Sequence, residues 1–346
     1  MKKKKVLLLG GAGFIGLGIA KYLGENKDYD ITIADIFSSG QKDDELNEVT
    51  SKYSIKLIEG DFANPKKFLL LDKQYDYVYM LASVVGVNRC INEPHEVIRI
   101  NTALIQNSLE WINNNDINKV LFASSSECYA ATTDSFNYPI PTSEVVPLTI
   151  SEIAHPRFTY AVTKMLGESA FLNYGKHYGF PATIVRYQNI FGPRMGFKHV
   201  IPHLVERFYN NTENPFKIYG AEQTRAFCFI SDAAEGTVLA MENINSDQEI
   251  YHIGSPIEIS IEKLVHAVGE LMNFRGEYLA AETYPGSVSR RCPDISKSID
   301  QLGYSPKVAW EDGLSKTVEW YKNFFDSGMK IYSGGFEPPE NLVFNG

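Results

Sequence analysis

A tyrosine and a lysine four positions apart, Tyr160 and Lys164, form the side-chain pair with the most distinctive chemistry in this 346-residue chain. On a helix, residues at i and i+4 share a face, so the phenol and the ammonium would be neighbours. A phenol has a pKa of about 10 and acts as a base near neutral pH only when its anion is stabilised. Because a nearby positive charge favours the phenolate, the pair predicts a tyrosine that accepts a proton from a substrate.

Hydroxyl and carboxyl side chains follow the apolar run at residues 120–123, which we expect to form a strand. Ser124, Ser125, Ser126 and Glu127 come directly after it. In an open parallel sheet, the carboxyl ends of the strands carry the site. A hydroxyl there could hydrogen-bond to a reacting oxygen, although a serine-rich loop without chemical function has the same composition.

A glycine-rich turn joins the first expected strand to the first expected helix. Gly10 permits the tight turn, Gly13 lets the backbone approach a pyrophosphate, and Gly16 lets the helix pack closely on the strand. The helix begins near Phe14 and Ile15, and its free N–H groups and positive dipole end would face the phosphates. The turn predicts a dinucleotide-binding site.

Two aspartates strengthen this prediction. Asp35 ends the second expected strand, about 20 residues further on, where a carboxylate can bind both ribose hydroxyls and would repel a 2′-phosphate. Asp61 ends the third expected strand, where it could reach an adenine. The sequence therefore predicts NAD rather than NADP as the cofactor.

Short apolar runs alternate with helical patterns through the first half of the chain. The runs are almost continuously apolar, as in a parallel sheet covered on both faces. The alternation predicts an α/β fold: a Rossmann-like doubly wound parallel sheet with a smaller mixed α/β substrate domain. We expect strands at residues 6–9, 31–34, 55–58, 77–81, 120–123 and 182–187, and helices at 14–23, 94–113 and 160–178.

The pattern changes after Gly192, where shorter elements separated by proline, glycine and asparagine follow. We expect residues 1–191 to form the NAD-binding domain, with part of 229–250 returning to it. Residues 192–346 would mainly bind the substrate, and the tail from Gly334 would be irregular. The later elements are expected at residues 201–209, 216–219, 232–241, 261–271 and 314–325.

Composition excludes several classes of protein. The net charge of −9 argues against nucleic acid as a partner, because phosphate binding requires a basic excess. The four cysteines form no CxxC pair and no zinc spacing, so we expect no metal site and a reducing, cytoplasmic location. No stretch of about 20 apolar residues exists, so we expect no membrane span. Glycines interrupt the apolar run after the basic start, unlike in a signal peptide.

At these residues the chain resembles an extended short-chain dehydrogenase/reductase of the NAD-dependent nucleotide-sugar epimerase/dehydratase family. The matching pieces occur in the family's order and span nearly the whole chain. They are GGAGFIG at 10–16, Asp35, Gly60-Asp61, Leu81-Ala82-Ser83, Asn101, SSSECYA at 124–130, YAVTK at 160–164, RYQNIFGP at 186–193, TRAFCFISD at 224–232 and RRCPDISK at 290–297.

The resemblance implies catalytic roles. Tyr160 would remove the proton of the sugar's 4-hydroxyl while hydride passes from carbon 4 to NAD⁺, and Lys164 would lower the pKa of the tyrosine and bind the nicotinamide ribose. Ser125 falls where the family has its catalytic hydroxyl, and Ser126 and Glu127 follow as further catalytic candidates. Tyr160 is itself an expected cofactor contact, and the remaining ones are Phe62, Leu81, Ala82, Ser83, Asn101, Ser124 and Tyr187.

The resemblance also implies how the substrate, a nucleotide-diphosphate sugar, is held. Asn189 would bind its diphosphate, and Arg225 and Arg291 match arginines that hold phosphates or sugar. Arg89, in the loop after the fourth strand, and Val200 are further expected substrate contacts. The proline-containing insertion at residues 131–156 is expected to form a lid over the sugar.

The reaction that follows oxidation is less determined. Glucose-type 4,6-dehydratases of the family carry Asp–Glu where this chain has Ser126–Glu127, and losing a general acid costs about 10²- to 10⁴-fold. The leading expectation is therefore net epimerisation or release of the 4-keto sugar. Decarboxylation or 4,6-dehydration is the alternative, because Ser–Glu with Arg291-x-Pro also resembles uronic-acid decarboxylases. A non-catalytic NAD-binding sensor is a remote alternative.

The family is usually dimeric, with the helices near 101–113 and 160–178 pairing as a four-helix bundle. A homodimer of this kind is therefore expected. Several apolar residues on these helices are compatible with burial either in that bundle or against the sheet. They are Ala103, Leu104, Leu109, Ala161, Met165 and Phe171.

Overall fold

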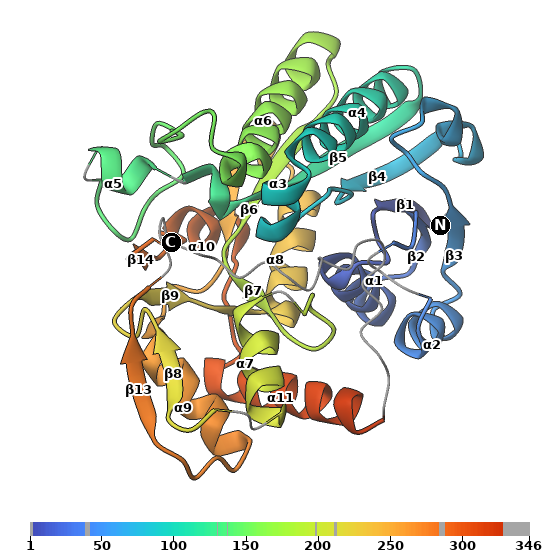
Figure 1. Cartoon of the computed structure of the whole chain (residues 1–346). Helices are drawn as coiled ribbons and strands as arrows, with labels where there is room; N and C mark the ends of the chain where they lie inside the picture. The colour runs from blue at the N-terminus through green and yellow to red at the C-terminus, as the bar shows by residue number, and fades with distance from the viewer. Residues whose placement is uncertain are drawn as a thin grey trace.

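Seven parallel strands form one sheet in the computed structural model, which describes residues 3–38, 42–129, 131–136, 138–197, 199–210, 213–283 and 288–327. The strand order is β11-β6-β5-β4-β1-β2-β3. Figure 1 labels the strands of this order from β6 to β3. The predicted Rossmann-like α/β fold is confirmed. The strands are β1 (Lys4–Leu9), β2 (Tyr29–Asp35), β3 (Lys56–Glu59), β4 (Gln74–Met80), β5 (Asp116–Ser125), β6 (Ala182–Tyr187) and β11 (Ile250–Ile253).

The side chains of β1 point alternately into two separate cores. Val6 and Leu8 belong to one apolar cluster, whereas Leu7 and Leu9 belong to the other. Successive residues of a strand face opposite sides of the sheet, and here both sides are buried. This double burial explains why the strands read as continuous apolar runs in the sequence.

Helices cover both faces of the sheet. α1 (Phe14–Asn26) and α8 (Ile230–Glu242) pack together on one face. α4 (Pro94–Asn113) and α6 (Thr159–Tyr178) lie side by side on the other face (Figure 1). The short, mostly polar α2 (Asp44–Lys52), which the sequence did not predict, begins at a side-chain cap from the residue before it.

The strand order reverses at the centre of the sheet. β1 lies between β2 and β4, so the chain runs outward from β1 in one direction to β3 and in the other from β4 to β11. In such sheets, ligands bind outside the carboxyl ends of the strands at this switch point. The glycine turn follows β1 at this place.

The part of the chain after β6, which we call the second region, contains a third apolar core and three small sheets. The strand pairs are β7 with β10 and β8 with β13, while β9 lies between β12 and β14. The helices expected here are present, with ends that differ by a few residues. The elements are β7 (Ile190–Phe191), α7 (Val200–Asn210), β8 (Phe216–Tyr219), β9 (Thr224–Ala226), β10 (Cys228–Phe229), β12 (Glu258–Ser260), α9 (Ile261–Leu271), β13 (Tyr278–Ala281), β14 (Arg290–Arg291), α10 (Ser296–Leu302) and α11 (Trp310–Asp326).

The chain returns to the main sheet after β10. The segment expected to return, residues 229–250, contains α8, and the seventh strand β11 starts at its last residue and pairs with β6. α10 then packs on α8 and β11. The sequence did not predict β11, because its four residues follow a polar loop and are too few to show a period.

The insertion at residues 131–156 is attached to the body of the protein at its middle. Thr142 forms an isolated bridge with Pro293, and its backbone N–H donates to the carbonyl oxygen of Cys292 at 3.0 Å. Glu144 is buried. A short helix, α5 (Thr132–Phe136), precedes these anchors.

The remaining sequence expectations concern membranes, metals and the tail. Within the described part of the chain, no helix is both long and apolar enough to cross a membrane. The same residues contain no group of three or more His, Cys, Asp or Glu side chains that could hold a metal ion. The tail from Gly334 lies outside the described residues.

Candidate active site

Of the three glycines expected to shape the turn, Gly10 and Gly16 have no room for a side chain, whereas Gly13 has. Gly10 has φ +84°, and a Cβ there would lie 2.4 Å from the backbone nitrogen of Ala82. A Cβ on Gly16 would lie 2.5 Å from the Cα of Gly11. Gly13, the residue that caps α1, has no neighbour nearer than 3.7 Å. The open side therefore faces the N-terminus of α1, where Phe14 and Ile15 begin the helix, and fits a pyrophosphate.

Asp35 lies at the carboxyl end of β2 and closes this turn. Its carboxylate accepts hydrogen bonds from the backbone N–H groups of Ala12 at 3.0 Å and Phe37 at 2.8 Å. Burial raises the pKa of Asp35, and these backbone donors partly oppose the effect. Arg194 reaches the same turn from the second region and donates to the carbonyl oxygen of Ala12 at 2.8 Å.

The expected adenine site combines one exposed and one buried residue. Asp61 is exposed, and its carboxylate accepts a hydrogen bond from the backbone N–H of Ala63 at 3.0 Å. Phe62 points into the core, where its ring meets Phe68 at a centroid distance of 5.2 Å. The side chain of Phe62 therefore stabilises the fold, and its backbone is the part that a cofactor could reach.

The loop after β4 is fixed against the glycine turn. The backbone N–H groups of Leu81 and Ala82 both donate to the carbonyl oxygen of Leu9, at 2.9 and 2.8 Å. Ser83 follows, and its hydroxyl contacts the carbonyl oxygen of Val84 at 3.4 Å. This arrangement places the loop at the predicted cofactor crevice.

Asn101, expected to contact the cofactor, forms side-chain hydrogen bonds with other residues of the protein. It is buried on α4, and its side-chain oxygen accepts a hydrogen bond from the backbone N–H of Val84 at 2.7 Å. Its Nδ2 donates to Val84 and to the hydroxyl of Thr163, each at 3.1 Å. Asn101 is therefore a positioning residue that ties the cofactor loop to α6. Arg89, on the short helix α3 (Val87–Asn92), pairs with Glu93 at 3.3 Å.

Three of the expected catalytic residues meet at the carboxyl end of β5. Ser125 ends that strand, and Tyr160 is the second residue of α6. A hydrogen bond joins the side chains of Ser125 and Tyr160. One turn along α6, Lys164 places its Nζ 5.5 Å from the centre of the Tyr160 ring, and this ammonium donates to the carbonyl oxygen of Ala123 at 2.7 Å.

The electrostatics of this group differ from the sequence expectation. Burial raises the pKa of Tyr160, and the hydrogen bond to Ser125 opposes this only in part. Burial also lowers the pKa of Lys164 to about 8. In the protein without its cofactor, burial outweighs the opposing hydrogen bond and the pKa of the phenol stays raised, while the Lys164 ammonium bonds to Ala123.

Two predicted cofactor residues point away from this centre. The buried Ser124 donates its hydroxyl hydrogen to Glu168. The hydroxyl of Tyr187 is hydrogen-bonded to that of Thr237 at 2.9 Å on the other face of the sheet. Strand side chains alternate between faces, so these neighbours of the site are directed into the core. Their expected contact with the cofactor therefore stays a prediction, and their side-chain hydroxyls are engaged within the protein.

Arginines surround Glu127 beside Ser125, the expected catalytic hydroxyl. Arg291 on β14 pairs with Glu127 at 2.6 Å and also reaches the hydroxyl of Ser126 at 3.4 Å. Arg291, followed by Arg157 and Arg225, lowers the pKa of Glu127. Sequence analysis missed Arg157, although its place three residues before the catalytic tyrosine was a usable signal.

The remaining expected substrate residues lie on β9, just before β7 and at the start of α7. Arg225 on β9 donates to the carbonyl oxygen of Val288 at 2.6 Å, and burial, followed by the charge of Arg291, lowers its pKa to about 10. Asn189 has φ +43° and donates to the carbonyl oxygen of Ala226 at 3.1 Å. The amide nitrogen of Asn189 therefore holds the β7–β9 junction. Val200 begins α7 and is exposed.

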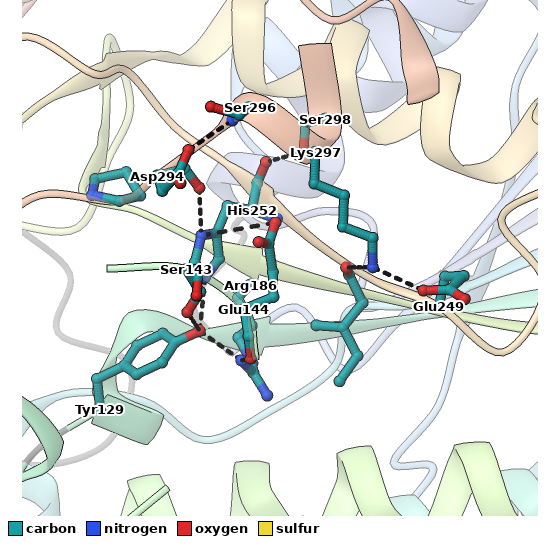
Figure 2. A network of polar contacts seen from close by, with 12 residues as sticks. Tyr129, Ser143, Glu144, Arg186, Glu249, His252, Asp294, Ser296, Lys297 and Ser298 are labelled. Atoms are coloured by element: carbon teal, nitrogen blue, oxygen red, sulfur yellow. Dashed lines mark hydrogen bonds and ion pairs between the residues drawn. The ribbon is translucent and has the colours of Figure 1, made fainter. Parts of the chain in front are cut away.

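A buried polar network supports the segment Ser126–Tyr129 after β5, which we call the catalytic loop (Figure 2). The hydroxyl of Tyr129 contacts Nε2 of His252 at 2.6 Å and also accepts a hydrogen bond from Arg186. Arg186 pairs with Glu168 at 2.7 Å and donates to the carbonyl oxygen of Glu144 at 3.0 Å. The network joins the catalytic loop, β6, β11, α6 and the insertion.

Comparison with known proteins agrees with this geometry. Residues 6–254 match the model of the NAD dependent epimerase/dehydratase family. Because the match covers most of the chain, this protein belongs to that family. It is an NAD-dependent enzyme, and the open glycine turn with Asp35 fits that cofactor.

Among curated relatives, the UDP-N-acetyl-alpha-D-glucosaminuronate decarboxylase of Bacillus cytotoxicus is 33% identical over 331 residues, covering 92% of this chain and 98% of that protein. A putative UDP-glucose 4-epimerase of Methanocaldococcus jannaschii is 30% identical over 321 residues, with coverage of 92% and 98%. The chain is therefore similar to enzymes with different final reactions.

Among solved structures, the UDP-N-acetylglucosamine 4-epimerase of Methanobrevibacter ruminantium, in complex with UDP-N-acetylmuramic acid, has a TM-score of 0.80 at 28% identity and covers 95% of this chain and 100% of its own. A mutant UDP-glucuronic acid 4-epimerase of Bacillus cereus, bound to a fluorinated UDP-glucuronic acid and NAD, has a TM-score of 0.80 at 26% identity, with coverage of 92% and 99%. The fold thus matches nucleotide-sugar enzymes over almost its full length.

Proposed function

We propose that this protein oxidises carbon 4 of a nucleotide-diphosphate sugar and yields either the 4-epimer or a released 4-keto sugar. The observation that carries the proposal is the meeting of Ser125, Tyr160 and Lys164 at the carboxyl end of β5. This group lies on the same edge of the sheet as the glycine turn after β1. A proton acceptor and a dinucleotide site therefore share one crevice.

In this proposal Tyr160 accepts the proton of the sugar's 4-hydroxyl, and Ser125 donates a hydrogen bond to the same oxygen. NAD, held at the open side of Gly13 and by Asp35, supplies the hydride acceptor when bound. Lys164 adds positive charge near the phenol, with a pKa close enough to neutral for the charge to respond to pH. The arginines near Glu127 and the segment from Asn189 to Val200 would hold the nucleotide diphosphate and sugar.

Decarboxylation of a uronic-acid sugar is a second candidate, supported by the surroundings of Glu127. Three arginines influence this one carboxylate, so positive charge exceeds negative charge beside the catalytic hydroxyl. Such a site would attract a carboxylate on carbon 6. A 4-keto group would then stabilise the electron pair left when carbon dioxide departs. The relative from Bacillus cytotoxicus is named for this kind of reaction.

A panel of nucleotide sugars incubated with NAD⁺ tests both candidates. Mass spectrometry of the products separates an epimer or a 4-keto sugar from a pentose-type product that has lost carbon dioxide, and NADH absorbance reports oxidation. Absence of both NADH formation and isotope exchange at carbon 4 with every sugar would count against carbon-4 oxidation. Carbon dioxide release from a UDP-uronic acid would establish the second candidate.

We also propose that residues 1–191, together with part of residues 229–250, bind NAD, and that residues 192–346 mainly bind the sugar nucleotide. The four cysteines are free, buried thiols, which supports a reducing location such as the cytoplasm. Limited proteolysis with and without NAD tests the division. NAD should protect cleavage sites in the first part more than sites in the second.

We further propose a homodimer formed through α4 and α6. Of the six apolar residues considered from the sequence, Leu104, Leu109, Ala161 and Phe171 are buried within one chain, so they do not support a bundle. Other large side chains on these helices are exposed. They are Ile98, Leu166, Tyr174 and Tyr178.

A further inference from the structure

A buried glutamine lies one residue beyond β6 without a partner for its side-chain amide. Gln188 is 2% exposed, and its Nε2 makes no hydrogen bond. Its backbone N–H donates to the carbonyl oxygen of Ile253 at 3.0 Å, which fixes the backbone in place. Because buried polar groups are almost always hydrogen-bonded, this unmet donor indicates a group that the protein itself does not supply.

Gln188 lines a cavity of about 20 Å³ between the catalytic loop, the insertion and β14. Tyr129, Thr142, His252 and Arg291 form other parts of its wall. A space of roughly 10–15 Å³ on this measure holds one water molecule. The cavity therefore has room for a single small polar group.

The cavity adjoins the catalytic residues. In the register of β5 and β6, Ser125 lies opposite Tyr187, so Gln188 continues the strand beside Ser126. Arg291, which bounds the cavity, lies 3.4 Å from the hydroxyl of Ser126. A substituent of a sugar held at Ser125 would thus be within reach of this wall.

Two other polar residues of the wall, His252 and Thr142, are already engaged. His252 contacts the carbonyl oxygen of Asp294 through Nδ1 at 2.8 Å and Tyr129 through Nε2 (Figure 2). Thr142 donates its hydroxyl hydrogen to the carbonyl oxygen of Pro139 at 3.1 Å. Gln188 therefore provides the unmet amide donor, while Arg291 provides a guanidinium that is also paired with Glu127 at 2.6 Å.

We propose that Gln188 and Arg291 form a subsite for an acyl oxygen carried by the sugar, and the proposal rests on the proposed carbon-4 chemistry. An acyl oxygen accepts a hydrogen bond from the amide and is attracted by the guanidinium. Two substituents have this chemistry, a carboxylate at carbon 6 and the carbonyl of an acylamino group. Gln188 then selects sugars that carry an acyl group over plain hexoses.

The replacement Gln188→Met tests the subsite, because methionine keeps the length of the side chain and removes its hydrogen bonds. The readout is kcat/KM for NADH formation or product formation with UDP-glucuronic acid, UDP-N-acetylglucosamine and UDP-glucose. We expect a loss of roughly 10- to 100-fold for the acyl sugar that the wild type prefers and less than about 3-fold for UDP-glucose. Gln74→Met, at the exposed amino end of β4, is the matched control.

The replacement Gln188→Glu separates the two sources of the acyl oxygen. A carboxylate at this position repels the carboxylate of UDP-glucuronic acid, and it has no N–H to donate to the carbonyl oxygen of an acetylamino group. If kcat/KM falls selectively with UDP-glucuronic acid, the acyl oxygen belongs to the carboxylate at carbon 6. If kcat/KM is retained with UDP-glucuronic acid but falls with UDP-N-acetylglucosamine, it belongs to the acylamino carbonyl.

Three results would overturn the subsite and leave the proposed function intact, whereas a fourth would overturn both. Equal losses of kcat/KM on all three sugars with Gln188→Met would show a general structural role. Unchanged discrimination, or a wild type that turns over only UDP-glucose, would remove the subsite while carbon-4 oxidation stands. A wild type that turns over no nucleotide sugar would overturn both. Unfolding temperature and NAD binding of each variant identify a variant that has failed to fold.

Discussion

At the scale of single residues, the site depends on where two ionisable groups lie rather than on their identities alone. Tyr160 and Lys164 occur on one face of α6, as their spacing predicts. Burial raises the pKa of Tyr160 and lowers that of Lys164, so both shifts favour the neutral forms. Ser125 bonds to the phenol, while Lys164 bonds to the backbone of Ala123. Formation of the phenolate therefore requires positive charge beyond that of the lysine.

Replacement of Tyr160 by Phe should lower the rate of carbon-4 oxidation by roughly 10²- to 10⁴-fold, because the proton acceptor is lost while the ring still packs. The Kd for NAD should change little. Single-turnover NADH formation and calorimetric NAD binding measure the two effects. Unaltered turnover by Tyr160→Phe would assign the base role to another residue.

Lys164 gives a prediction for the pH dependence of stability. Its pKa is about 8 in the folded protein, against 10.5 for the ordinary group. The unfolded chain therefore binds more protons between these values, so the lysine's burial penalty is constant below about pH 8 and disappears as the pH rises toward 10.5.

The free energy of unfolding of the wild type, measured relative to Lys164→Met by urea denaturation, should rise by about 1–3 kcal/mol across that window. Below pH 8 the difference should be constant. The variant Lys66→Met, on an exposed turn, serves as the control. A difference that falls with rising pH would contradict the depressed pKa.

At the scale of elements, a buried ion pair holds the catalytic loop, α6 and β6 together. Arg186 on β6 and Glu168 on α6 are both almost fully buried, and Ser124 bonds to the same carboxylate. Arg186 also holds the insertion through Glu144. The insertion expected to act as a lid thus has a fixed middle, attached to the sheet rather than only to its own ends.

The variant Arg186→Met should lose about 3–5 kcal/mol in free energy of unfolding, because Glu168 would stay buried without its partner. Arg99→Met breaks an exposed pair with Glu96 and should cost less than about 1 kcal/mol. Chemical denaturation measures both. Similar losses for the two variants would show that the buried pair contributes no more than a surface pair.

At the scale of the whole molecule, segments distant in sequence complete one crevice. The glycine turn and the catalytic helix come from the first part of the chain, whereas Arg225 and Arg291 come from the second. Arg194 crosses between them and touches the cofactor turn at Ala12. Binding of NAD and of sugar should therefore be coupled through these shared contacts.

The exposed apolar side chains on α4 and α6 lead to a prediction for assembly. Leu166→Glu should convert a dimer into monomers, because a carboxylate buried in an apolar interface lacks compensation. Light scattering after size exclusion measures the mass, and Leu69→Glu, an exposed leucine outside these helices, is the control. A wild-type monomer at micromolar concentration would refute the proposed dimer.

The sequence by itself determined the fold class, and it predicted that Tyr160 and Lys164 lie together. Local spacing places Tyr160 and Lys164 on one helix face, and the glycine pattern depends on backbone geometry within a few residues. Short-range rules of this kind need no knowledge of distant contacts. The continuous apolar strands likewise reveal a doubly covered sheet.

Only the tertiary structure decided which neighbouring side chains face the site. Ser124 and Tyr187 lie beside the proposed catalytic residues but direct their hydroxyls to Glu168 and Thr237, and Asn101 ties a loop to a helix. Arg157 and the unmet amide of Gln188 gain meaning only from segments folded against them. The physical reason is that side-chain direction, burial and hydrogen-bond satisfaction depend on contacts between residues far apart in sequence, which spacing does not encode.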